Sequence, residues 1–321
     1  MSEYRVAVAD ARFGSYKEEE KVLKEVGAEL VMHDLKSDHE AIEALRDMDG
    51  ILLNLYPLNA RVIGLLKKCK IISRYGVGYD NVDVEAATSQ GIWISNVPDY
   101  AYEDVSDHAL AMLLDCVRKI TAKDRKVRRG EWNLHDKFRC HRIKDRILGL
   151  IGYGGIARAL HRKVSGLGLA KVLVYDPYID REYIRDCGGN PCDFETLLKE
   201  SDFITIHAPL TKETRKLVGA KQLAMMKEEA ILINTSRGPL VNEAALIKAL
   251  QEKRIGFAGL DVFESEPLPK DSPLKKLENV ILTDHAGWFT EESFVELKTK
   301  AAANIAEVFR SGKPIYPVNQ V

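Results

Sequence analysis

Short apolar runs alternate with helical segments of about ten residues in two separate parts of the chain. Such alternation is typical of βα units, whose strands pair into a parallel sheet. The first series of expected strands comprises Arg5–Ala9, Glu29–His33, Gly50–Leu55, Lys70–Arg74 and Ile92–Asn96. The second comprises Ile147–Gly152, Lys171–Tyr175, Phe203–His207, Ala230–Asn234, Gly256–Leu260 and Val280–Leu282. Two series predict an α/β protein with two doubly wound parallel-sheet lobes.

The length of the chain agrees with two lobes, because 321 residues are too many for one ordinary hydrophobic core. A helix is expected at Tyr100–Ile120, and the hydrophilic stretch Thr121–Asp145 leads to the second series. The last expected helix, Glu291–Arg310, follows the completed second series. If this helix packs on the first lobe, that lobe is discontinuous in sequence. The residue pattern alone does not decide whether it does.

Charge and composition exclude several classes of protein. A net charge of −1 argues against a nucleic-acid binder, which needs a basic surface, and the basic segment Arg118–Arg129 is interpreted as a solvated helix face. No run reaches the about 18 apolar residues of a membrane span, and no signal peptide is evident. The 5 cysteines form no CxxC pair, so we expect no metal site and a reducing cytoplasm.

A glycine-rich turn follows the first strand of the second series. Residues 152–157 read Gly-Tyr-Gly-Gly-Ile-Ala, which matches the G-x-G-x-x-A pattern of dinucleotide-binding turns. In that pattern Gly152 permits the tight turn, Gly154 lets the backbone approach a pyrophosphate, and Ala157 lets helix and strand pack closely. The helix N-terminus offers N–H groups and a partial positive charge to the phosphates. The turn therefore predicts a dinucleotide site.

An acidic residue ends the next expected strand and indicates which dinucleotide is bound. Asp176 lies about 20 residues beyond the turn, where a carboxylate can bind the hydroxyls of the adenosine ribose. Pro177, Tyr178 and Ile179 follow it, so neither Arg nor Lys stands immediately there to hold a 2′-phosphate. We therefore expect NAD rather than NADP.

Polar residues follow three late strands, at the edge where ligands bind in open parallel sheets. They are Asn234, Thr235, Ser236 and Arg237 after the first, Asp261, Glu264 and Glu266 after the second, and Asp284, His285 and Trp288 after the third. Arg237 has a planar fork that grips a carboxylate, and His285 titrates near neutral pH and suits acid/base chemistry. Glu266 or Asp284 would hold the imidazole. Reduction of a 2-keto acid needs this cation and this proton donor.

Seven stretches of the chain together resemble the D-isomer-specific 2-hydroxyacid dehydrogenase family over nearly its whole length. They are Ser73–Asp83, Val105–Leu114, Leu148–Ala157, His207–Val218, Ile233–Leu246, Gly259–Pro267 and His285–Ser293. Residues 97–111 and 285–293 most resemble the branch with phosphoglycerate-dehydrogenase-like enzymes and the carboxyl-terminal binding proteins. The resemblance implies a Rossmann NAD-binding domain at residues 100–288 and a discontinuous, flavodoxin-like substrate domain at 1–99 and 289–321. It also implies a homodimer built through the cofactor domains.

The resemblance also implies roles for individual residues. Arg237 aligns with the substrate-binding arginine, His285 with the acid/base and Glu266 with the partner of the histidine, in preference to Asp284 or Glu264. The positions aligned with cofactor contacts are Gly152, Gly154, Gly155, Ile156, Asp176, Ala208, Pro209, Thr235, Ser236 and Asp261, the last toward the nicotinamide amide. The turn Gly76-Val77-Gly78 resembles one whose N–H groups hold the substrate carboxylate, although relatives often carry Ser or Thr at Val77. Trp288 is expected either to contact the substrate or to pack between domains.

We therefore expect an NAD-dependent D-2-hydroxyacid dehydrogenase, or 2-keto acid reductase, with His285 as acid/base. The alternative is an NAD(H)-sensing binding protein of the corepressor type with little turnover. Both classes retain the Arg, Glu and His, so these residues do not separate them. No basic cluster for a substrate phosphate stands out, which favours glyoxylate, pyruvate or hydroxypyruvate over phosphoglycerate.

Overall fold

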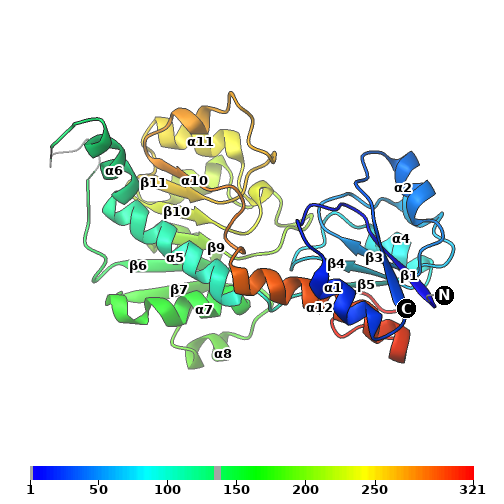
Figure 1. The fold of residues 1–321 in the computed structure, drawn as a ribbon. Helices are drawn as coiled ribbons and strands as arrows, with labels where there is room; N and C mark the ends of the chain where they lie inside the picture. The colour runs from blue at the N-terminus through cyan, green and yellow to red at the C-terminus, as the bar shows by residue number, and fades with distance from the viewer. Residues whose placement is uncertain (1–2, 134–138) are drawn as a thin grey trace. The chain divides into compact units, whose positions relative to one another are not determined.

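The computed structural model describes residues 3–133 and 139–321. The chain divides into two compact units, of which the first joins Met1–Tyr100 to Thr290–Val321 and the second is Ala101–Phe289. Each unit contains one parallel sheet with helices on its faces (Figure 1). The first unit is thus discontinuous in sequence, because the last helix, α12 (Glu291–Ser311), packs on strands formed by the N-terminal hundred residues.

The sheet of the first unit has five strands in the order β2-β1-β3-β4-β5, all parallel. This is the flavodoxin-like order that the resemblance implied. The strands are β1 (Tyr4–Val8), β2 (Ala28–Met32), β3 (Gly50–Leu53), β4 (Ile71–Arg74) and β5 (Trp93–Ser95). The helices α2 (Asp38–Leu45), α3 (Ala60–Ile63) and α4 (Val84–Ser89) share one core with the sheet, whereas α1 (Lys17–Lys24) packs on α12.

The sheet of the second unit has seven parallel strands in the order β12-β11-β10-β9-β6-β7-β8. Numbered from β6, its first six strands have the Rossmann order 3-2-1-4-5-6, so the order reverses between β6 and β9. The strands are β6 (Ile147–Ile151), β7 (Lys171–Tyr175), β8 (Asn190–Pro191), β9 (Phe203–Ile206), β10 (Ile231–Asn234), β11 (Phe257–Leu260) and β12 (Val280–Leu282). Both predicted sheet architectures are confirmed.

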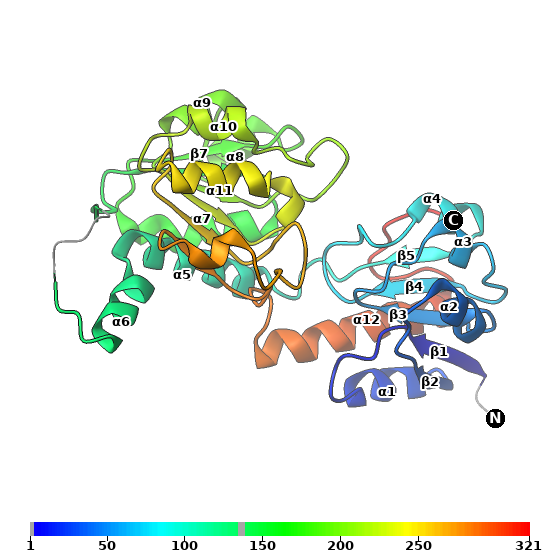
Figure 2. The same ribbon diagram turned by 90° about the horizontal axis from the view of Figure 1, so that it is seen from above.

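Two cores cover the faces of this sheet, which explains its apolar strands. Figure 2 shows α5 (Tyr102–Arg118) away from α9 and α10, and α7 (Gly155–Val164) packs against α5. Side chains of α5, α7 and α8 contribute to one core, and side chains of α9, α10 and α11 contribute to the other. The bounds are Arg181–Asp186 for α8, Phe194–Glu200 for α9, Ala220–Met225 for α10 and Glu243–Gln251 for α11.

The expected helix Tyr100–Ile120 is shorter than predicted and is followed by a second helix, α6 (Ile120–Arg128). The break falls at Lys119, whose backbone is left-handed with φ 58°. Its side chain is only 5% exposed and places Nζ 3.2 Å from the centre of the Phe257 ring. In the single chain α6 has no buried residue, as the prediction of a solvated face requires, but that prediction is wrong for Lys119.

The short strand β8 was not predicted, because two residues carry no periodicity. Every other strand begins and ends within two residues of its predicted bounds. Among the described residues, none of the helices combines the length and the apolar character that crossing a membrane requires.

Candidate active site

The turn between β6 and α7 lies where the strand order of the second unit reverses. Gly152 has φ +89°, and a Cβ there would lie 2.8 Å from the His207 carbonyl carbon and oxygen. Since β9 ends at Ile206, this close approach joins the carboxyl ends of the two strands that flank the reversal. Ala157 is fully buried, so a larger side chain would separate α7 from the sheet. These contacts agree with the dinucleotide-binding interpretation of the turn.

The start of α7 fits a pyrophosphate. Gly154 is the N-cap, and no side chain of this residue caps the first turn of the helix. A Cβ on Gly154 would meet nothing within 4 Å, so packing inside the protein does not require glycine at this position. A backbone that is open on one side at a helix N-terminus is the arrangement that binds phosphate groups.

Asp176 follows β7 and is fixed by the backbone of the same turn. Its Oδ2 accepts a hydrogen bond from Tyr153 N at 2.8 Å, and its Oδ1 accepts from Tyr178 N at 2.8 Å and Ile179 N at 3.2 Å. The half-buried carboxylate is thus held beside the glycine turn. These three bonds use three of the roughly four lone-pair sites of the carboxylate, so Oδ2 keeps acceptor capacity for a ribose hydroxyl.

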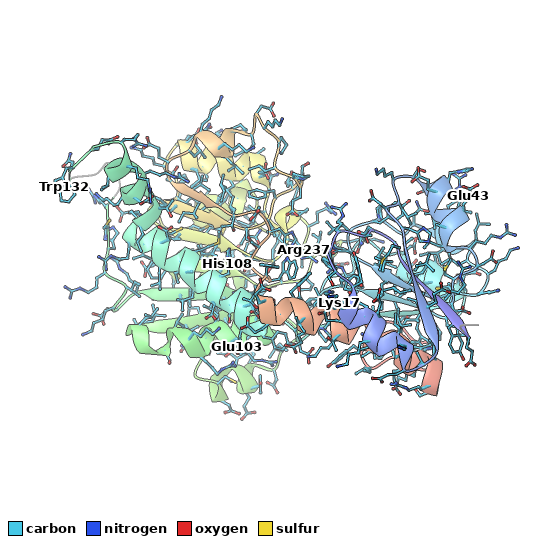
Figure 3. The ribbon with its side chains drawn as sticks, viewed as in Figure 1. Lys17, Glu43, Glu103, His108, Trp132 and Arg237 are labelled. Atoms are coloured by element: carbon cyan, nitrogen blue, oxygen red, sulfur yellow. The ribbon has the colours of Figure 1, made fainter. Side chains whose placement is uncertain are left out.

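Arg237 lies in a loop after β10 that its neighbours hold in place (Figure 3). The buried Asn234 donates from Nδ2 to Arg237 O at 2.9 Å and accepts from Ser236 N at 3.1 Å. Gly238 lets this loop approach the segment after β11, because a Cβ there would lie 1.9 Å from the carbonyl of Phe263. Arg237 Nη1 donates to Ser236 O at 2.9 Å, and the positive charge of Arg237 contributes to lowering the pKa of Glu266.

His285 and Glu266 form the contact at the centre of the site. The His285 Nδ1 lies 2.7 Å from Glu266 Oε2, and both side chains are about one-third exposed, at 33% and 35%. Glu266 Oε1 accepts from Phe263 N at 2.9 Å. Burial raises the pKa of Glu266, but the hydrogen bond and charge of His285, the Phe263 N–H and the charge of Arg237 outweigh it and lower the pKa overall. Glu266 is therefore an anion at neutral pH.

Spacing alone left open which carboxylate accompanies His285. The structure brings Glu266 to the ring, whereas Asp284 is exposed. Glu264 exchanges contacts with α11 instead, since its Oε1 accepts from Glu243 N at 3.2 Å. With Nδ1 turned to Glu266, the Nε2 of His285 is the nitrogen left to exchange a proton with a ligand.

Asp261 is almost completely buried, and its carboxylate is hydrogen-bonded within the protein. It is 1% exposed and accepts hydrogen bonds from Ala286 N and Gly287 N, both at 2.9 Å, and from Thr283 Oγ1 at 2.5 Å. Burial raises the pKa of this carboxyl, but the hydrogen bond of His108 and those of Thr283 and Gly287 outweigh it and lower the pKa to about 2.

The remaining predicted residues of the second unit lie in the loops after its strands. Ala208 and Pro209 follow β9, and Thr235 and Ser236 follow β10, where Ser236 Oγ donates to Ile206 O at 2.7 Å. Ile156 is half-buried in the first turn of α7. The half-buried Trp288 packs edge-on against Phe289, with ring centroids 5.5 Å apart.

In the first unit, the turn Gly76-Val77-Gly78 follows β4 and is anchored through its first two residues. Gly76 O accepts from Val97 N at 3.0 Å, and Val77 O accepts from Asn96 Nδ2 at 2.7 Å. The preceding Tyr75 is buried and donates its hydroxyl to Glu19 Oε1 at 2.9 Å. This turn is therefore held by a backbone N–H and a side chain from another part of the same unit.

Sequence reasoning gave no role to Asn234, Gly238, Thr283 or His108, which organise the loops of the site. Asn234 stood in a recognised strand-end group, but the carbonyl it binds was not evident. His108 lies in α5, 175 residues before its partner Thr283, so no local pattern links them.

The chain is similar in sequence to a known protein family and to several of its members. A family model described as D-isomer specific 2-hydroxyacid dehydrogenase, NAD binding domain, matches residues 110–287. A glyoxylate reductase of Korarchaeum cryptofilum is 40% identical over 283 residues, which are 87% of this chain and 85% of the relative. A D-3-phosphoglycerate dehydrogenase of Methanocaldococcus jannaschii is 40% identical over 292 residues, which are 90% of this chain but 55% of the relative.

The fold also matches solved structures. The crystal structure of a D-lactate dehydrogenase from Aquifex aeolicus, complexed with NAD and lactic acid, aligns with a TM-score of 0.84 at 26% sequence identity. The alignment covers 96% of this chain and 96% of that one.

Proposed function

The chain belongs to the D-isomer-specific 2-hydroxyacid dehydrogenase family, and we propose on this basis that it reduces a small 2-keto acid to the D-2-hydroxy acid with NADH. It is an NAD-dependent oxidoreductase acting on 2-hydroxy acids. The observation that carries the assignment of catalytic residues is the contact between His285 Nδ1 and Glu266 Oε2 beside the Arg237 loop. Accordingly, we assign residues 100–288 to cofactor binding, and 1–99 with 289–321 to substrate binding.

In this proposal each of the three side chains has one task. Arg237 binds the substrate carboxylate and carbonyl through its planar fork. His285 donates a proton from Nε2 to the carbonyl oxygen as negative charge develops on it. Glu266 holds the ring through Nδ1 and stabilises the imidazolium that reduction consumes. NADH, when bound, supplies the hydride to C2 of the substrate.

The other predicted site residues complete the proposal. The backbone at Gly152, Gly154, Gly155 and Ile156 binds the pyrophosphate, and Asp176 binds the adenosine ribose. Ala208, Pro209, Thr235 and Ser236 line the cofactor, and Asp261 contacts the nicotinamide amide. The N–H groups of Gly76-Val77-Gly78 bind the substrate carboxylate, and Trp288 contacts the substrate side chain.

A panel of 2-keto acids tests the proposed reaction and narrows the substrate. The purified protein is mixed with NADH and, in separate assays, glyoxylate, hydroxypyruvate, pyruvate and phosphohydroxypyruvate. We expect NADH consumption with one or more of the first three acids to exceed that with the phosphorylated acid. A protein that binds NADH but turns over none of the four would instead favour the nucleotide-sensing alternative.

Cofactor choice should depend on Asp176. Its carboxylate accepts hydrogen bonds from ribose hydroxyls but repels a 2′-phosphate. We expect kcat/KM for NADH to exceed that for NADPH by at least about tenfold, or ~1.4 kcal/mol. Asp176→Asn should reduce this preference, while Asp186→Asn, on the exposed surface of the neighbouring helix α8, should leave it unchanged. Equal kcat/KM values for the two cofactors in the unsubstituted protein would contradict the assignment of Asp176.

We also propose a cytoplasmic homodimer formed through the second unit. Apolar side chains of α6 and the segment after it are exposed in the single chain, with Ile120 at 59%, Val127 at 53% and Trp132 at 90%. Exposed apolar side chains gathered on one segment are typical of a surface that a partner covers. The five free cysteines support a reducing compartment.

The dimer predicts an effect of charge on this segment. Light scattering after size exclusion should give the mass of two chains for the unsubstituted protein. Val127→Lys combined with Trp132→Glu should shift the population toward one chain, because charged groups would be buried in the interface. Leu65→Lys, at an exposed position of the first unit, is the control. A monomeric unsubstituted protein, or a variant that remains fully dimeric, would overturn the proposed interface.

A further inference from the structure

We propose that His108, acting through Thr283 and Asp261, is a positioning residue that sets the conformation of His285. The inference rests on the proposed function, since it concerns the geometry of the proposed acid/base. Figure 3 shows His108 on α5, the long helix of the second unit. This helix packs against β11 and β12, the two strands after which Asp261 and Thr283 stand.

The three side chains form a continuous chain of contacts. His108 Nε2 lies 3.0 Å from Thr283 Oγ1 and 3.4 Å from Asp261 Oδ1. Thr283 Oγ1 lies 2.5 Å from the same Asp261 oxygen. Asp261 is almost completely buried, and its Oδ1 also accepts from Ala286 N while its Oδ2 accepts from Gly287 N.

The charge of Asp261 fixes the direction of each hydrogen bond. The carboxyl has its pKa lowered to about 2 and is therefore ionised, so it only accepts. Thr283 must then donate its hydroxyl hydrogen to Asp261, which leaves the threonine oxygen as the acceptor for His108. The Nε2 of His108 accordingly carries a hydrogen. Both the neutral Nε2–H tautomer and the protonated ring can make this contact.

Asp261, the last of the three residues, binds the backbone around His285. The Asp261 carboxylate binds the N–H groups of Ala286 and Gly287, the two residues that directly follow His285. In addition, His285 N donates to the Asp261 carbonyl at 2.8 Å. His285 itself has φ +60°, a left-handed conformation that is unfavourable for a non-glycine residue. These three backbone hydrogen bonds offset that cost and fix the direction from which the ring approaches Glu266.

His108 is therefore placed to act on the proton donor without touching the substrate. Removal of its N–H donor leaves Thr283 with one fewer partner and weakens the restraint on Asp261. A shift of about 1 Å in a catalytic group can cost on the order of 100-fold in rate. If His108 acts through His285, the loss of rate should appear in kcat, and the dissociation constant of NADH should be nearly unchanged.

A double-mutant cycle with His285 tests the proposal in the intact protein. We expect His108→Leu to lower kcat for keto-acid reduction by about tenfold or more, whereas His108→Gln, which keeps a side-chain N–H, retains most of the activity. In the His285→Ala background, His108→Leu should change the residual kcat by less than about twofold, because two residues acting through one group are not additive. His39→Leu, at an exposed position of the first unit, is the matched control.

Thr283 provides a second variant in case His108→Leu is poorly folded. Thr283→Val removes the hydroxyl at similar volume and Thr283→Ser keeps it, so the valine variant should lose kcat and the serine variant should not. NADH affinity from fluorescence titration and thermal melting are measured for every variant. Equal losses from His108→Leu with and without His285 would overturn the inference, as would a loss confined to NADH affinity. If His285→Ala itself leaves kcat unchanged, the proposed function fails instead.

Discussion

Replacement of His285 by alanine is expected to lower the rate of keto-acid reduction by about 10²–10⁴-fold, the usual contribution of a general acid. The substrate oxygen would then take its proton from water rather than from a held imidazolium. The limb of the pH–rate profile that belongs to this residue should disappear in both reaction directions. Kinetics with saturating NADH measure the effect, and unchanged NADH affinity serves as the control for folding. A variant with an unchanged pH profile would exclude His285 as the acid/base.

The same mechanism fixes the sign of the pH dependence. Reduction needs the imidazolium, so reductive kcat/KM should fall as pH rises, and oxidation needs the neutral ring, so oxidative kcat/KM should rise. Glu266 is ionised because its contacts with His285, the Phe263 N–H and Arg237 outweigh burial and lower its pKa. Glu266→Gln removes the negative charge that stabilises the imidazolium. The reductive limb should then move to lower pH.

Asp284→Asn is the matched control for that shift, because Asp284 is an exposed neighbour of His285 in sequence. Its profile should coincide with that of the unsubstituted protein. If Asp284→Asn moves the limb and Glu266→Gln does not, the working partner of His285 is Asp284, in spite of the 2.7 Å contact with Glu266.

Arg237→Lys is expected to lower kcat/KM by roughly 100-fold or more, although it keeps the positive charge. Lysine lacks the planar fork that binds carboxylate and carbonyl together, so the substrate would be held without its orientation. NADH affinity should change much less. Arg185→Lys, on the exposed surface of α8, is the matched control. Near-normal kcat/KM in Arg237→Lys would contradict a bidentate contact at this position.

The sequence predicted most of the sheet because buried parallel strands are continuous apolar runs. β6, β9, β10 and β11 are buried along nearly their whole length, and each appears in the sequence as such a run. The break between α5 and α6 was missed for the opposite reason, since helical periodicity continues through Lys119. Its left-handed backbone accompanies a contact with Phe257, a residue far away in sequence.

The site shows the same division between local and distant contacts. The glycine turn and Asp176 lie within one βα unit, so spacing alone indicated that they belong together. Spacing did not choose Glu266 over Asp284, because the choice depends on how the loop after β11 folds back on His285. The contact of His108 with Thr283 spans 175 residues and joins a helix to a loop after β12, which no sequence pattern marks.

The transfer of deuterium from labelled NADH tests the central claim most directly. The protein is incubated with pyruvate and NADH that carries deuterium at the transferable position, and the product is examined by mass spectrometry and chiral chromatography. The proposed mechanism predicts D-lactate with one deuterium at C2, and its formation should fall sharply in His285→Ala. A product with no deuterium at C2, or L-lactate as the labelled product, would contradict the mechanism.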